Sequence, residues 1–289
     1  MTQTSSPTLE IPTRRMNFDE ALQTVPKHFG KDGDLVASHV TAALSSVFPD
    51  GEDFFVKSVR AFRDQITDPV LKKQVAGFIG QESVHGREHR VFNERLAELG
   101  YPTKQAEWLT KKGLAIRWKL APKKANLAVT AALEHFTATL AELILSDPEA
   151  RAVFGDETVK NLFLWHALEE AEHKAVSFDV YKAVGGSERI RVLTMNVLRY
   201  GFVLAMSAEV AISLAFDKRT YKPGVLFKSL RRFMKSPMMS RKVWKQLKDY
   251  NRKDFHPNDS NHTGLVDGWR EELFGANGTL NDKLAGVAA

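Results

Sequence analysis

The sequence contains no cysteine among its 289 residues. This absence excludes disulfide bonds, thiolate zinc sites, iron–sulfur clusters and a cysteine nucleophile, so histidine and carboxylate side chains must hold any metal. The first residues lack the apolar segment and small-residue cleavage site of a secretory signal. The alternation of apolar and polar residues that marks β-hairpins is also missing. We therefore expect a cytoplasmic, bacterial-type protein built from helices.

Positive charge is concentrated towards the C-terminal end. The chain carries 41 Lys and Arg against 35 Asp and Glu, a net charge of +6. Much of the excess lies in residues 228–253, KSLRRFMKSPMMSRKVWKQLKDYNRK. Such a run is usually a solvated helix face, although it is also found at contacts with nucleic acid or anionic lipid. Because no nucleic-acid-binding motif accompanies it, we expect no nucleic-acid partner.

Helical periodicity dominates the rest of the chain. We expect a flexible arm over residues 1–17, a helical domain over 18–260 and a C-terminal tail over 261–289. Within the domain, Pro49 should end a first helix over 34–48, with Asp50 as N-cap of the next. The further predicted helices cover residues 51–66, 70–99, 104–119, 123–146, 156–184 and, beyond the bundle, 189–250.

The connectivity of these helices predicts an all-α, ferritin-like four-helix bundle with additional N- and C-terminal helices. Two helices joined by a short link are followed by a long crossover and then by two more, which is the order found in ferritin-like proteins. The bundle core should cover about residues 51–185.

Two histidines and three glutamates fall within HALEEAEHK, residues 166–174. Helical spacings of i, i+4 and i+7 place His166, Glu170 and His173 on one stripe, with Glu169 at its margin and Glu172 pointing away. Glutamate and histidine at i, i+3 recur on two helices, as Glu82-x-x-His85 and Glu170-x-x-His173, and this spacing turns both side chains towards one metal. The remaining two helices supply Glu134, in the apolar context AVTAALEHFTATLAE, and Glu52. The predicted metal ligands are therefore Glu52, Glu82, His85, Glu134, His166, Glu170 and His173.

Some of these assignments have alternatives. A single E-x-x-H is common on solvated helices, whereas two of them with an inward glutamate on each other helix indicate a carboxylate-bridged pair of metal ions. For Glu52, stabilisation of a helix dipole in a first turn stays open as an alternative role. His89, at i+7 from Glu82, is a candidate catalytic proton donor, a hydrogen-bond partner behind the ligands or an additional ligand. His256 in DFHP is a candidate proton shuttle if that turn folds back over the metals, and otherwise an exposed residue.

The blocks FFVKSVRAFRDQITD, FIGQESVHGREHRVFNE, ALEHFTATLAE and LWHALEEAEHKAVSFDVY, with DFHP, resemble a bacterial, ferritin-like family called metal-dependent hydrolases. The resemblance covers about residues 30–260 and implies hydrolysis. The spacing His166-xxx-Glu170-xx-His173 also resembles the three-histidine di-iron centre of the p-aminobenzoate N-oxygenase group. In that comparison the other ligands would correspond to Glu52, Glu82 with His85, and Glu134.

The ligand set predicts two bound metal ions and favours iron, with manganese or zinc as alternatives. Our leading hypothesis is an O2-activating oxidase or oxygenase that uses an electron donor. A metal-dependent hydrolase is the second hypothesis and a non-catalytic metal-binding protein the third. The sequence has no G-x-S-x-G elbow for a serine nucleophile.

The most hydrophobic stretch covers residues 192–216, VLTMNVLRYGFVLAMSAEVAISLAF, and is interrupted by Arg199 and Glu209. Placing both charges in lipid is costly, so packing against the bundle is the simpler interpretation. The alternative is that residues 192–250 contact a membrane or line a pocket for an apolar, lipid-like small molecule. Self-association into a homo-oligomer is left open.

Overall fold

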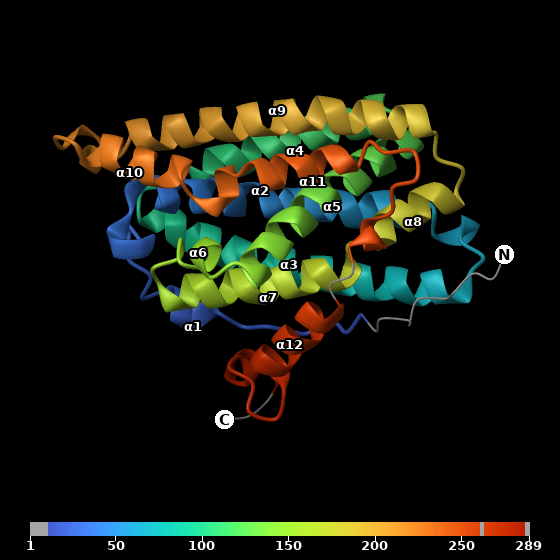
Figure 1. Cartoon of the computed structure of the whole chain (residues 1–289), viewed down its shortest axis with the longest axis horizontal. Helices are drawn as coiled ribbons and strands as arrows, with labels where there is room; N and C mark the ends of the chain where they lie inside the picture. Colours follow the sequence, from blue (N-terminus) through green and yellow to red (C-terminus); the bar gives the residue numbers. More distant parts are fainter. Residues whose placement is uncertain (1–10, 261–262, 287–289) are drawn as a thin grey trace.

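The protein is a bundle of α-helices in its computed structural model, which describes residues 11–260 and 263–286 (Figure 1). Within these residues there is no β-strand, only the isolated bridges Met16 with Leu284 and Gly30 with Phe154, so the all-α prediction is confirmed. The helices are α1 (Asp19–Leu22), α2 (Leu35–Arg60), α3 (Pro69–Glu98), α4 (Thr103–Leu120), α5 (Lys123–Ser146), α6 (Pro148–Arg151), α7 (Glu157–His173), α8 (Val176–Ala183), α9 (Glu188–Ala215), α10 (Val225–Met234), α11 (Arg241–Asp249) and α12 (Thr263–Phe274).

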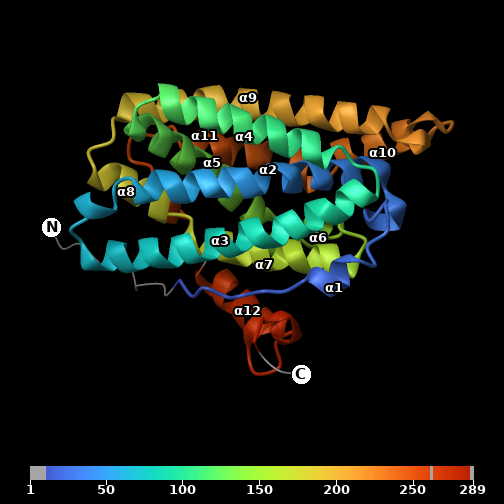
Figure 2. The same cartoon turned by 180° about the vertical axis from the view of Figure 1, so that it is seen from behind.

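Helices α2, α3, α5 and α7 form the central bundle. Helix α2 packs on α3, α5 packs on α7, and contacts of α2 with α5 and of α3 with α7 close the bundle. Helix α4 follows α3 and precedes α5 in the chain, and it packs against α2. It therefore forms the predicted long crossover. Helix α9 lies outside the bundle against α2 and α5, along the edge furthest from α12 (Figures 1 and 2). This order of elements fits the ferritin-like bundle that the sequence predicted.

Pro49 does not end a helix, so the predicted boundary there is wrong. Helix α2 runs through it from residue 35 to 60, and its N-cap is Asp34, whose side chain accepts from Ala37 N, rather than Asp50. A proline inside a helix leaves the carbonyl four residues earlier without its usual donor. Here Asn93 of α3 donates its side-chain amide to that carbonyl, Ser45 O, at 3.1 Å. A tertiary hydrogen bond therefore allows one long helix where the local sequence predicts two.

The fourth bundle helix is also divided differently from the prediction. Helix α7 begins after Asp156, whose side chain accepts from Val159 N, and it ends at His173. A short break follows, and α8 then packs against α3 and α5. The single helix predicted over residues 156–184 is therefore two helices, with the predicted ligands at the end of the first.

The apolar core is interrupted halfway along the bundle by a polar layer. One cluster of buried apolar side chains includes Phe92 of α3 and Leu162 of α7, and a second includes Phe78 of α3 and Leu127 of α5. On α3, Glu82 and His85 lie between Phe78 and Phe92 in the sequence and are buried as well. The predicted ligands thus occupy a layer with apolar packing towards both ends.

The segment expected to be a flexible arm packs on the bundle from residue 11 onward. Two glycines of α3 allow this close approach, because a Cβ at Gly77 would come 2.5 Å from Ile11 O and a Cβ at Gly80 would collide with Thr13. The approach buries Arg14, which is 8% exposed. Residues 1–10 of the expected arm lie outside the described residues.

Candidate metal centre

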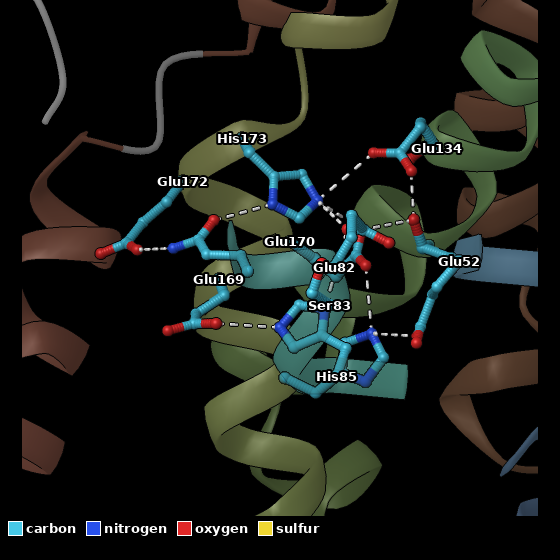
Figure 3. Close-up of polar contacts among 12 residues, drawn as sticks. Glu52, Glu82, Ser83, His85, Glu134, Glu169, Glu170, Glu172 and His173 are labelled. Atoms are coloured by element: carbon cyan, nitrogen blue, oxygen red, sulfur yellow. Dashed lines mark hydrogen bonds and ion pairs between the residues drawn. The ribbon is translucent and has the colours of Figure 1, made fainter. Parts of the chain in front are cut away.

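All seven predicted ligands come together in the middle of the bundle. Figure 3 labels all of them except His166. Two groups have ligand atoms within 4.8 Å of one another: Glu52 with His85 and His166, and Glu82 with Glu170 and His173. Glu134 of α5 joins the second group, with Oε2 3.3 Å from His173 Nε2. Because α2 begins at residue 35, Glu52 lies in mid-helix, so stabilisation of a first turn is not its role.

The cluster contains more close contacts between nitrogen and oxygen atoms than hydrogen bonds can account for. His173 Nε2 lies 3.1 Å from Glu82 Oε1, 3.3 Å from Glu134 Oε2 and 3.4 Å from Glu170 Oε2. One ring nitrogen carries at most one proton, so it cannot serve three carboxylates. Among the described residues, neither oxygen of Glu52, Glu82 or Glu134 has a hydrogen-bond partner, and neither do His85 Nδ1 and His173 Nε2. Such orphaned atoms, converging from four helices, fit metal ligation.

The electrostatics of the cluster favour the binding of positive charge. Burial, reinforced by the charges of Glu82 and Glu170, raises the pKa of Glu134 to about 8. Burial likewise raises the pKa of Glu52 and of Glu82. Burying several carboxylates without compensation costs several kcal/mol each, at the order-of-magnitude level. Bound cations would remove this cost, and carboxylate oxygens with imidazole nitrogens suit iron, manganese or zinc.

Each of the three histidines has a partner behind it that orients its ring. His85 Nε2 lies 3.0 Å from Glu169 Oε2, and His173 Nδ1 lies 2.8 Å from Gln81 Oε1. His166 Nδ1 lies 2.7 Å from His89 Nε2. The ring nitrogens left facing the carboxylates are therefore His85 Nδ1, His166 Nε2 and His173 Nε2. Outer hydrogen bonds of this kind fix the tautomer of a metal-ligating histidine.

His89 belongs to a hydrogen-bonded chain rather than to the cluster itself. Its Nδ1 lies 2.9 Å from Ser45 Oγ, which donates to Asn93 Oδ1 at 2.7 Å. The Asn93 amide also donates to Glu107 Oε1 at 2.8 Å, near the surface of α4. Burial holds the pKa of His89 well below its ordinary value, so its ring is neutral. Of its predicted roles, the structure supports that of a hydrogen-bond partner behind the ligands.

Two outer residues, Arg14 and Gln81, were not found from the sequence. Arg14 Nη1 donates to Glu169 Oε1 at 2.9 Å, and its two Nη atoms donate to both oxygens of Glu172 at 2.8 Å. Gln81 Nε2 donates to Glu172 Oε2 at 2.8 Å, and Arg270 of α12 contacts the same carboxylate at 2.9 Å. Glu172 does point away from the metal ligands, but towards the buried Arg14 and Gln81 and the half-buried Arg270 rather than solvent. No local signal marks Arg14, which is 155 residues from Glu169.

His256 is not part of the cluster, so its predicted role as a proton shuttle near the metals is not supported. Its Nε2 lies 2.8 Å from Asp179 Oδ1 and its Nδ1 accepts from Asn258 N, which caps the 3₁₀ turn Pro257–Asp259. The cavity beside it, of about 220 Å³, has none of the seven ligands in its wall. His135 likewise faces away, with Nε2 2.9 Å from Gln246 O.

An apolar cavity of about 500 Å³ reaches the cluster from one side. Glu52 and Glu170 both lie in its wall, with Thr137, whose hydroxyl donates to Glu170 Oε2 at 2.5 Å. Among the described residues that line it there is no Lys or Arg. The one carboxylate in the wall besides the two ligands is Glu209, which accepts from Ser46 Oγ at 2.6 Å and whose pKa is raised by burial. The remaining wall residues are mostly apolar: Leu44, Val47, Phe48, Phe55, Leu109, Leu114, Leu133, Phe136, Leu140, Phe202, Met206 and Ile212.

A further group of metal-ligating side chains, His28, His39 and Asp217, differs from this centre. Lys27 Nζ lies 3.3 Å from Asp217 Oδ2, the oxygen that both histidines also approach. The ammonium group already balances the carboxylate, so this group is better described as a structural ion-pair network.

Comparison with known proteins supports the resemblance seen in the sequence. A family model described as "Predicted metal-dependent hydrolase" matches residues 12–261, a range that contains the whole cluster and its outer partner Arg14. No curated protein and no solved structure matches the chain.

Proposed function

This chain belongs to the predicted metal-dependent hydrolase family, and we propose that its buried cluster holds two metal ions that act on an apolar small molecule. Glu52, His85 and His166 would hold one ion, and Glu82, Glu170 and His173 the other, with Glu134 beside the second group. The observation that carries this proposal is that Glu52 and Glu170 form part of the wall of the apolar cavity. A molecule in that cavity would lie directly against the ligands.

Within the two-metal proposal, we favour oxidation that depends on dioxygen. A pair of iron ions in a carboxylate and histidine bundle supplies dioxygen activation when bound. The residues of this chain support such use in three ways: apolar walls bind the substrate and exclude water, Thr137 orients Glu170, and the His89 chain holds the tautomer of His166. The described residues of the cavity wall include no cation that would bind an anionic hydrolysable group. An external electron donor is part of this proposal.

Hydrolysis is the second candidate, because the family description favours it. In that case the chemistry supplied by the ions is the activation of water, with manganese or zinc in place of iron. The substrate would still have to fit the apolar cavity, which points to an uncharged ester or amide. A purely metal-binding role is the remaining hypothesis.

Elemental analysis of protein purified without added ions is the first test. We expect about two metal ions per chain. Glu134→Gln and His173→Ala should both lower this content, because each removes a ligand. Glu209→Gln is the matched control, since Glu209 lines the same cavity but contacts Ser46 rather than the cluster. Absence of metal from wild-type protein expressed with sufficient iron, manganese and zinc would refute the metal centre.

The reaction class is tested by comparing two assays on the same preparations. Dioxygen-dependent oxidation predicts that reduced, iron-loaded protein consumes oxygen and that Glu134→Gln protein does not. Hydrolysis predicts that zinc- or manganese-loaded protein cleaves apolar esters or amides under anaerobic conditions. Anaerobic cleavage without oxygen consumption by the iron form would replace the first candidate with the second.

A further inference from the structure

Beyond its first turn, which contains Glu188 and the exposed Arg189, helix α9 exposes a long face that carries no charged side chain. Arg191 and Arg199 are buried, and Glu209 faces inward to Ser46. Of the two described helices whose length and composition would allow them to cross a membrane, α5 is 67% buried over its most apolar window and α9 only 17%. Helix α5 is thus a core helix, whereas α9 is largely uncovered. The large exposed side chains of α9 and the residue after it are Ile190, Leu193, Val197, Tyr200, Leu204, Ile212 and Phe216.

Exposed apolar side chains continue onto the two helices beside α9. Helix α4 lies next to α9 along the same side of the molecule, and α10 lies at its C-terminal end (Figures 1 and 2). We use the term apolar face for the exposed large apolar residues of these three helices. The apolar face consists of the α9 residues named above together with Trp108, Leu109, Ile116 and Leu120 of α4, and Phe227, Leu230 and Met234 of α10.

Most of the exposed charged residues around the apolar face are cations; the exceptions are Glu188 at the start of α9, which pairs with Lys182 and Arg191, and Asp32, which lies 3.9 Å from Arg232. Between residues 189 and 248 the only acidic residues are Glu209 and Asp217, and neither is exposed. In α4 the only acidic residue is Glu107, which is partly buried and accepts from Asn93. The exposed cations of α4 and of the α9 to α10 region are Lys104, Lys111, Lys112, Lys119, Arg189, Lys218, Lys222, Lys228, Arg231, Arg232 and Lys235.

We propose that the apolar face binds the surface of an anionic lipid membrane, with α9 lying along the interface. Apolar side chains surrounded by lysine and arginine are the composition of an interfacial helix, because the former enter the acyl region and the latter meet anionic headgroups. A second copy of this chain fits less well, since a contact between two identical faces would bring their cations close to one another. Helix α9 does not span the bilayer, because Arg191, Arg199 and Glu209 hold one side of it against the protein.

The same helices form the outer wall of the cavity beside the metal centre. Phe202, Met206 and Ile212 of α9 and Leu109 of α4 line it, and Glu52 and Glu170 lie in its wall as well. An apolar substrate would therefore pass from the membrane between α4 and α9 to the centre without crossing water. This delivery route rests on the proposed function, whereas the membrane contact does not.

The test is flotation of the full chain with vesicles of phosphatidylcholine alone and of an equal mixture with phosphatidylglycerol. We expect the protein to float with the mixed vesicles and much less with phosphatidylcholine, and to be released at high salt. Leu204→Glu should lower the partition coefficient by roughly tenfold or more, because it places a charge in the centre of the face. Lys112→Glu should lower binding to the mixed vesicles only.

Val70→Glu is the matched control, since Val70 is 42% exposed but belongs to α3 on the opposite side of the bundle. It should float like the wild type. The proposal is overturned if wild-type protein does not float with either vesicle, or if Leu204→Glu floats as well as the wild type. It is also overturned if the wild type is a dimer that Leu204→Glu dissociates, without vesicle binding. Repeating flotation after chelation separates this proposal from the metal centre, because membrane binding should not require metal.

Discussion

His85 Nε2 lies 3.0 Å from Glu169 Oε2, and this contact leaves Nδ1 as the ring nitrogen that faces the carboxylates of the centre. Burial alone would lower the pKa of His85, but the hydrogen bond to Glu169 and the negative charges of Glu169 and Glu82 outweigh burial and raise the pKa to about 10. Glu169 thus supplies the negative charge and the orientation that a ligating imidazole requires.

Removing Glu169 should weaken metal binding without removing a ligand. We expect Glu169→Ala to lower metal affinity by roughly 10- to 100-fold, because His85 loses the partner that orients its ring. Competition with a chelator of known affinity measures the change. The control Glu149→Ala removes a carboxylate at the surface of α6 and should leave the affinity unchanged. Equal affinities for Glu169→Ala and wild type would mean that His85 is not a ligand.

Arg14 should be required for stability although it lies in an extended N-terminal segment. Arg14→Met leaves Glu169 and Glu172 without the cation that pairs with both, and breaking a buried pair in this way costs about 3 kcal/mol. Urea unfolding in the presence of a chelator measures the difference without a contribution from metal binding. The neighbouring exposed Arg15 is the matched control, and Arg15→Met should unfold like the wild type. Similar losses in both variants would contradict the role assigned to Arg14.

The glycine at position 77 should be needed for the N-terminal segment to dock on α3. Gly77→Ala brings a methyl group 2.5 Å from Ile11 O, so we expect a loss of about 1–3 kcal/mol and faster tryptic cleavage at Arg14 and Arg15. Gly113 of α4 has no neighbour within 4 Å of its Cβ position. Gly113→Ala should therefore raise stability by up to about 1 kcal/mol. Unchanged cleavage in Gly77→Ala would show that the segment docks without this close approach.

His39 should make the protein less stable as the pH falls below neutrality. Its Nδ1 lies 2.6 Å from Ser213 Oγ, and burial lowers its pKa from the ordinary value of 6.5 to about 4 in the folded state. Between these values the unfolded chain binds more protons, so the free energy of unfolding decreases with falling pH, by up to about 3 kcal/mol. In His39→Gln this contribution disappears. The stability difference between wild type and variant should therefore shrink from pH 7 to pH 4. Parallel curves of unfolding free energy against pH for the two proteins would contradict this role of His39.

The structure does not test the predictions about cellular location and partners. The cytoplasmic location, self-association, the absence of a nucleic-acid partner and the electron donor stay predictions. The domain boundaries at residues 17 and 260 also stay predictions, although residues 11–17 and α12 both contact the bundle through Arg14 and Arg270.

The sequence by itself determined which residues each helix carries and which of the predicted ligands share one helix face. Helical geometry relates residues three, four and seven positions apart, so Glu82 with His85, and His166 with Glu170 and His173, could be placed on common faces before any fold was known. The apolar context of Glu134 indicated burial in the same way. These are local relationships, and the structure preserves them.

Tertiary structure alone decided the features that depend on residues distant in the chain. Pro49 stays within one helix because Asn93 bonds the carbonyl that it leaves free, and Arg14 acts at the centre because Gly77 and Gly80 admit its segment. His256, in a motif that resembled the family, lies away from the centre because Asp179 binds it. Helical periodicity carries no information on such contacts, since they depend on how separate helices and segments meet in space.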